Sequence, residues 1–65
     1  MTTQAVPYFI RCRAPEEKRA KLLDPAGKLT SRRVYAARIP GDRVEGCLAE
    51  LREQNPGWIF SAVRV

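Results

Sequence analysis

The first clear pattern along the chain is an alternation of apolar and polar side chains that starts just after Pro7. In residues 8–13, one face of a strand would carry Tyr8, Ile10 and Cys12, and the other Phe9, Arg11 and Arg13. A period of two with aromatic and β-branched residues is typical of a half-buried β-strand. We therefore expect a strand over residues 8–13, ended by Pro15, after a flexible lead-in of residues 1–6.

A turn and a second strand are expected next. The pair Leu22-Leu23 is compatible with a short strand. The sequence Asp24-Pro25-Ala26-Gly27 predicts a tight turn, because proline presets φ at the second position and glycine suits the last. Residues 34–39, with the sequence VYAARI, predict a second full strand that stops at Pro40-Gly41.

The best-specified element is a helix over residues 43–54. Its apolar side chains recur at i, i+3, i+4 and i+7 and form one stripe: Val44, Cys47, Leu48 and Leu51. Asp42 is expected to cap this helix, and Glu45 completes a pattern similar to a capping box. Asn55 suits a left-handed position at the helix end, and Pro56-Gly57 prevents the helix from continuing.

Residues 58–65 alternate again and predict the last strand. One face would carry Ile59, Ser61, Val63 and Val65, and the other Trp58, Phe60, Ala62 and Arg64. If the first set lies under the helix, the open face is a platform of aromatic rings and arginines. If the second set lies there, Trp58 and Phe60 belong to the core, as large aromatic side chains usually do in a small domain. The alternation alone does not choose between the two.

These elements together predict one α+β domain over residues 1–65. A small antiparallel sheet of three or four strands would carry one helix packed on one face, in the order strand, short strand, strand, helix, strand. A chain of this length buries only about 60% of the surface that its unfolded form exposes, so the core must be thin.

Composition narrows the possible chemistry. The chain has no histidine, which removes the commonest general base and metal ligand. Cys12 and Cys47 are too few for a zinc site; they either pair across the core or stay reduced as small buried side chains. Ser31 and Ser61 stand in no nucleophile motif, and Lys28 lacks the spacing of a phosphate loop. We expect no catalytic residue, no metal and no cofactor, and hence no enzyme.

The sequence shows neither a membrane span nor a signal peptide, and this predicts where in the cell the protein is found. No stretch approaches the roughly 20 apolar residues of a membrane span. Residues 1–4 show no basic region of a signal peptide. We expect a cytoplasmic protein, with no membrane partner.

Charge is unevenly distributed along the chain. The net charge is +5. Between residues 11 and 38 nine basic residues face three acidic ones: Arg11, Arg13, Lys18, Arg19, Lys21, Lys28, Arg32, Arg33 and Arg38 against Glu16, Glu17 and Asp24. Such an excess favours an anionic partner, either nucleic acid or an acidic protein surface, although it also suits a merely solvated surface. These nine side chains are the candidate binding residues, with Phe9, Trp58 and Phe60 as candidates for stacking on bases.

From Leu22 to Val65 the chain resembles small accessory proteins of bacterial phages, prophages and other mobile elements. The resemblance rests on Asp24-Pro25-Ala26-Gly27, a link rich in threonine and arginine, the amphipathic helix, and Asn55-Pro56-Gly57-Trp58 before the last strand. The class includes anti-CRISPR proteins, which block a host complex stoichiometrically. The resemblance implies a non-enzymatic protein that binds and sterically inhibits a host protein or nucleoprotein complex in the bacterial cytoplasm. The alternatives are a direct nucleic-acid-binding module and a homodimer whose open sheet face is its interface.

Overall fold

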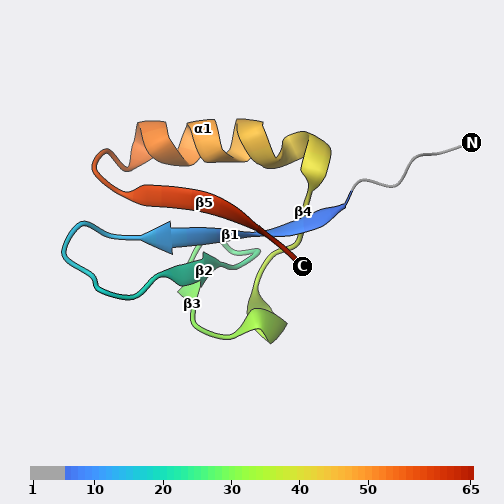
Figure 1. The fold of residues 1–65 in the computed structure, drawn as a ribbon, viewed down its shortest axis with the longest axis horizontal. Helices are drawn as coiled ribbons and strands as arrows, with labels where there is room; N and C mark the ends of the chain where they lie inside the picture. Colours follow the sequence, from blue (N-terminus) through green and yellow to red (C-terminus); the bar gives the residue numbers. More distant parts are fainter. Residues whose placement is uncertain (1–5) are drawn as a thin grey trace, which may run out of the picture.

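Strand β1 (Pro7–Arg13) is the central strand of a curled antiparallel sheet (Figure 1). The computed structural model describes residues 6–65, so the expected lead-in of residues 1–6 lies outside the described part except for Val6. β1 pairs along one edge with β5 (Ile59–Arg64), in a register that sets Tyr8 opposite Arg64 and Arg13 opposite Ile59. Both long strands were predicted from their alternation.

Short strands occupy the other edge of β1. β2 (Lys21–Leu23) pairs with the second half of β1, and β4 (Ile39–Pro40) pairs with its first two residues. β3 (Leu29–Thr30) pairs with β2 and forms the outer edge of the sheet. The single helix α1 (Val44–Gln54) lies over one face of the sheet (Figure 1). The structure therefore confirms the predicted α+β fold with one helix on one face.

The predicted turn joins β2 to β3 as a tight hairpin. The Oδ1 atom of Asp24 accepts hydrogen bonds from the backbone N–H groups of Ala26 at 3.0 Å and Lys28 at 2.8 Å. Gly27 has a φ of 83°, in the left-handed region that glycine enters without steric cost. Aspartate at the first position and glycine at the last thus close the hairpin for the reasons that the sequence suggested.

The two glycines at Gly27 and Gly46 give a matched test of these local conformations. Replacing Gly27 by alanine should lower the free energy of unfolding by about 1 kcal/mol, because a Cβ there is strained by the positive φ. The same replacement at Gly46, inside α1, should raise it by up to about 1 kcal/mol, since a Cβ there has no atom within 4 Å. Urea unfolding followed by circular dichroism measures both shifts. Shifts of the same sign would contradict this account.

Both ends of the helix differ from the sequence prediction. A 3₁₀ turn, η2 (Gly41–Arg43), precedes α1, and the residue before the helix is Arg43, with no side-chain capping bond. Asp42 lies inside this turn and does not cap the helix, so the capping prediction was wrong. At the other end Asn55 has a φ of −132° and is not left-handed, which is also a correction. Its side-chain N–H instead donates to the carbonyl of Leu51 at 3.1 Å.

The predicted strand over residues 34–39 is wrong except at its end. Residues Arg33–Tyr35 form a 3₁₀ turn, η1, and only Ile39 and Pro40 pair with β1. β2 already pairs with the neighbouring part of this edge of β1, so residues 34–37 find no free part of β1 to pair with. The backbone N–H of Ala37 instead donates to the carbonyl of Leu23 at 2.9 Å, which holds the link against β2.

The core lies between α1 and the face of the sheet that carries the aromatic residues of β5. Buried side chains from β1, α1 and β5 pack there: Ile10, Cys12, Val44 and Phe60. The register sets Cys12 opposite Phe60 and Ile10 opposite Ala62, so these side chains share one face. Burying this set removes large aromatic surfaces from water, whereas the alternative set would have buried the hydroxyl of Ser61. The opposite face therefore carries Arg11, Arg13, Ile59, Ser61 and Val63, and also Phe9 opposite Val63, whose side chain is buried, so it offers no exposed aromatic platform.

Candidate anion-binding site

A hollow of about 550 Å³ lies on the open face of the sheet, beside the segment that connects β1 to β2. It is lined by four cations from β1 and from this segment, together with three uncharged residues: Arg11, Arg13, Lys18, Arg19, Ala20, Ile59 and Ser61. We call this surface the cationic hollow. Its position follows from the β1–β5 register, which sets Arg11 opposite Ser61 and Arg13 opposite Ile59.

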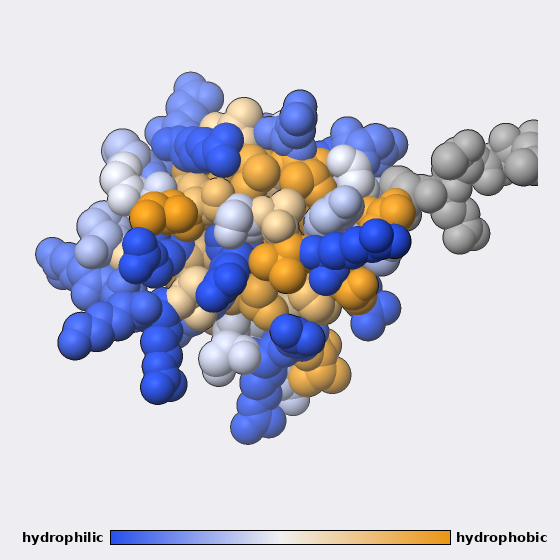
Figure 2. Space-filling view, in the orientation of Figure 1, coloured by the Kyte–Doolittle hydropathy of each residue, from blue (hydrophilic) through white to orange (hydrophobic). Residues whose placement is uncertain are grey.

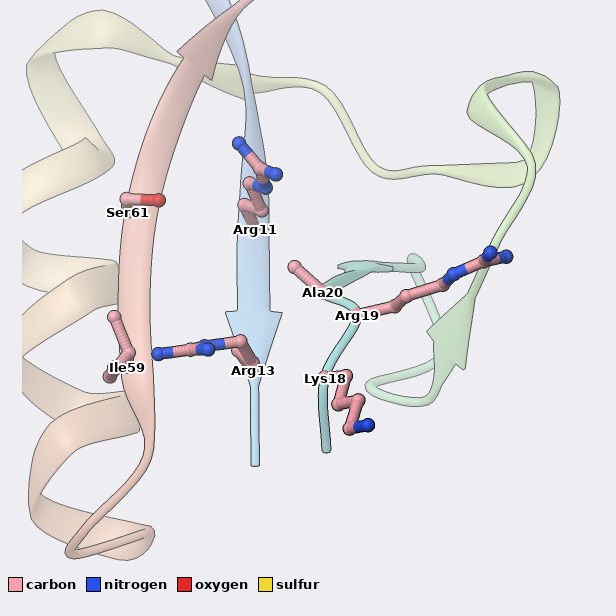
Figure 3. A pocket seen from close by; sticks show the side chains of 7 residues that line it. All are labelled: Arg11, Arg13, Lys18, Arg19, Ala20, Ile59 and Ser61. Atoms are coloured by element: carbon pink, nitrogen blue, oxygen red, sulfur yellow. The ribbon is translucent and has the colours of Figure 1, made fainter. Parts of the chain in front are cut away.

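The four cations of the cationic hollow stand on two different supports (Figure 3). Arg11 and Arg13 project from β1, and the side chain of Arg13 extends toward Ile59 on β5. Lys18 and Arg19 stand on the connecting segment, and the side chain of Arg19 extends away from β1, toward β3. A ligand could therefore meet two cations fixed to the sheet and two on the connecting segment.

The electrostatic character of the hollow is positive. No carboxylate is among its lining residues in the described part of the chain. The two acids of the connecting segment, Glu16 and Glu17, are exposed, and the N–H of Glu17 donates to the carbonyl of Ala14 at 3.1 Å in a turn. Guanidinium groups present several N–H donors in a planar fork that matches phosphate and carboxylate oxygens. The arrangement is suited to holding an anion.

The remaining five predicted cations lie outside the hollow. Lys21 lines a small cavity of about 30 Å³ beside Trp58. Lys28 stands on the β2–β3 hairpin, Arg32 and Arg33 lie at η1, and Arg38 precedes β4, all of them exposed. The nine candidate binding residues thus divide into one group of four around the hollow and five dispersed positions.

The aromatic residues do not take the role that one sequence interpretation gave them. Phe60 and Phe9 are each only 5% exposed, so neither ring can stack on a base. Trp58 is half-buried against the core and stacks on Phe60, with ring centroids 6.0 Å apart and planes 9° from parallel. The predicted stacking surface of Phe9, Trp58 and Phe60 is therefore not available in this structure: Phe60 packs beneath the helix with Trp58 against it, and Phe9 is buried on the other face of β1.

Both cysteines are free. Burial, followed by the nearby Cys47, raises the pKa of the Cys12 thiol. Burial, followed by the Glu50 carboxylate, raises the pKa of the Cys47 thiol. A raised pKa keeps each thiol protonated near neutral pH, where the protonated form is a poor nucleophile. They pack as small apolar side chains, which was one of the two sequence interpretations.

Three residues of the hollow were not among the candidates from the sequence: Ala20, Ile59 and Ser61. Ile59 is 53% exposed and Ser61 is exposed, both on β5 across from the arginines of β1. The alternation of residues 58–65 could have found them once the buried face was known. Ser61 adds a hydroxyl that can donate or accept a hydrogen bond, and Ile59 adds an apolar wall.

Comparison with known proteins gives no relative: no family model, no curated protein and no solved structure matches this chain. Within residues 6–65, no helix is long and apolar enough to cross a membrane. In the same part of the chain, no group of three cysteine, aspartate or glutamate side chains could hold a metal ion. The site must therefore be interpreted from its own geometry and charge.

Proposed function

We propose that this chain is a non-enzymatic binding protein whose cationic hollow holds the phosphate backbone of a nucleic acid. The observation that supports the proposal most is that Arg11, Arg13, Lys18 and Arg19 all line one hollow, with no carboxylate among its lining residues. Lysine and arginine side chains that neutralise phosphates supply most of the affinity of binding without sequence readout.

The chemistry of the hollow favours backbone contacts over contacts to bases. No aromatic ring is among the residues that line the hollow, and its apolar part is the aliphatic side chain of Ile59 together with Ala20. Single-strand binders gain affinity from stacking of bases on aromatic rings, which this face does not offer. A duplex, with one negative charge per about 1.7 Å of its axis, gives four cations more phosphates to reach. We therefore infer a preference for duplexes and little sequence selectivity.

A salt titration tests this proposal. Binding of a fluorescent 20-base-pair duplex of mixed sequence should weaken with salt, with a slope of log K against log salt of about −3 to −4. The slope corresponds to four phosphates neutralised by the four cations of the hollow. The single strand of the same length should bind no more tightly. Absence of binding at about 50 mM salt, or a slope near zero, would overturn the proposal.

A second candidate function is steric inhibition of a host protein or nucleoprotein complex, similar to the action of anti-CRISPR proteins. It is supported by the guanidinium groups of Arg11, Arg13 and Arg19 in the hollow, which match carboxylates as well as phosphates. In this reading the cations occupy an acidic subunit surface or compete for contacts that otherwise hold nucleic acid. For either function, we propose a location in the cytoplasm of a bacterial cell, as the sequence resemblance implies.

A pull-down from nuclease-treated bacterial lysate separates the two candidates. Inhibition of a host complex requires a protein that is retained stoichiometrically after the nucleic acid has been digested. The control is the Arg11→Glu/Arg13→Glu variant, which should lose the same protein. If nothing specific survives nuclease, this candidate fails. Sedimentation of the isolated chain addresses the third reading, since a dimer that dissociates in this variant would make the open face a homodimer interface.

A further inference from the structure

Exposed apolar side chains gather at one place on the described surface that the cationic hollow does not use. Val34 is 78% exposed, Tyr35 59% and Leu29 40%. Together with residues of the hairpin turn they line a shallow groove of about 600 Å³: Asp24, Pro25, Ala26, Leu29, Thr30, Val34 and Tyr35. We call it the hairpin groove. It shares no lining residue with the cationic hollow. Single exposed apolar residues are common, but a contiguous group of them in a groove is typical of an interaction site.

The hairpin groove is held in place by backbone hydrogen bonds. In η1 the N–H of Tyr35 donates to the carbonyl of Arg32 at 3.2 Å, and the N–H of Arg32 donates to the hydroxyl of Thr30 at 3.2 Å. The N–H of Ala37 donates to the carbonyl of Leu23 at 2.9 Å, which fixes the far end of η1 against β2. A surface that is ordered before binding loses less conformational entropy when it is occupied.

The charges around the hairpin groove are positive. Lys28 and Arg33 are exposed and directly precede the lining residues Leu29 and Val34, and the exposed Arg32 lies two positions before Val34. The lining contains one carboxylate, Asp24, whose Oδ1 atom already accepts two backbone hydrogen bonds of the turn. In the view of Figure 2, apolar surface reaches the lower end of the molecule, where η1 lies, between hydrophilic side chains. An apolar floor with a cationic rim complements an apolar anchor with acidic flanks.

We propose that the hairpin groove docks a protein segment that inserts an apolar side chain between Leu29, Val34 and Tyr35 and sets acidic residues against Lys28, Arg32 and Arg33. A protein segment fits better than nucleic acid because no cation is among the lining residues, and the only side-chain donors there are the hydroxyls of Thr30 and Tyr35. Interfaces of this kind are anchored by a few buried apolar or aromatic side chains within a polar rim. This docking does not depend on nucleic-acid binding by the cationic hollow.

A peptide selection tests the proposal. Random 12-residue peptides displayed on phage are selected on the immobilised full chain, and the selected peptides are synthesised with a fluorophore for affinity measurement. The selected sequences should be enriched in aspartate and glutamate around one large apolar residue. Their affinity should fall at least 10-fold for Val34→Ser/Tyr35→Ser. It should stay within about 2-fold for Val65→Ser, an exposed apolar residue that lines neither the hairpin groove nor the cationic hollow.

Several outcomes would overturn the proposal. The first is that no peptide binds below about 100 µM, and the second is that the selected peptides carry no acidic excess or bind Val34→Ser/Tyr35→Ser unchanged. A duplex oligonucleotide that loses affinity in this variant as strongly as the peptides would make nucleic acid the occupant. Dissociation of a dimer in this variant would make the occupant a second copy of the chain. Because both residues are exposed, the variant should keep the circular dichroism spectrum and the unfolding midpoint of the parent.

Discussion

Replacement of Phe60 by alanine is expected to lower the free energy of unfolding by about 3–5 kcal/mol. Phe60 is 5% exposed and packs with Ile10, Cys12 and Val44 in the core. Truncation of a buried phenylalanine costs about 3–5 kcal/mol. A domain of this size is stable by about 0.05–0.15 kcal/mol per residue, or roughly 3–10 kcal/mol in total. The loss of this one side chain therefore removes between about a third and all of the stability of the fold.

The matched control is Ile59→Ala, one position earlier on β5. Ile59 is 53% exposed on the opposite face, so its truncation should cost less than about 1 kcal/mol. Urea unfolding measured by circular dichroism gives both values, and Phe60→Leu, which leaves a smaller cavity, keeps the series measurable if the alanine variant does not fold. The comparison also tests the register. Equal losses at the two positions, or a larger loss at Ile59, would mean that the other face of β5 lies beneath the helix.

The sequence predicted those elements that depend on neighbouring residues. The turn at residues 24–27 forms because aspartate, proline and glycine each satisfy a local backbone requirement. Helix α1 forms over almost the predicted residues because its apolar stripe repeats with the period of a helix. The prediction of the helix start was wrong because of a tertiary constraint. The chain leaves β4 at Pro40 and enters a 3₁₀ turn directly.

Contacts between distant parts of the chain decided what the sequence left open. The strand expected over residues 34–39 looked like a strand by composition, but its exposed Val34 and Tyr35 have no partner, because β2 takes that edge of β1. The sequence alone did not decide which face of β5 lies beneath the helix, because alternation gives two sets of side chains and no preference between them. Packing of Phe60 against α1 resolved it, and that packing involves elements that are far apart in the sequence.

The sequence predicted that basic residues form the candidate site, but it did not predict which of them come together. All four cations of the cationic hollow were among the nine predicted, together with five that lie elsewhere. What distinguishes Arg11 and Arg13 is the strand pairing that sets them opposite Ser61 and Ile59. The path of the segment after β1 brings Lys18 and Arg19 to the same hollow. The sequence of this segment has no strong local pattern that predicts its path. A charge count along the chain contains neither piece of information.

Reversal of two charges in the cationic hollow is expected to have the largest effect on nucleic-acid binding. The Arg11→Glu/Arg13→Glu variant removes two of the four cations that we propose to contact phosphates and places two carboxylates in their stead. Affinity for the mixed duplex at about 100 mM salt should fall by about 100-fold or more, since charged hydrogen bonds contribute about 1.5–3 kcal/mol each. The salt slope should also fall by about 2, one for each phosphate contact that is lost. Both side chains are exposed on the strand, so the fold should survive the change.

The control with the same change in net charge is Arg32→Glu/Arg33→Glu, near η1 and outside the hollow. If the hollow holds the phosphates, this variant should lose only about 3- to 10-fold, through the weaker field of the whole protein, and should keep most of the salt slope. Fluorescence anisotropy titrations at four salt concentrations measure both quantities for both variants. Equal losses would mean that net charge alone drives binding, and the hollow would then have no special role. A loss confined to Arg11→Glu/Arg13→Glu assigns the phosphate contacts to the open face of the sheet, because the two variants differ only in where the charges stand.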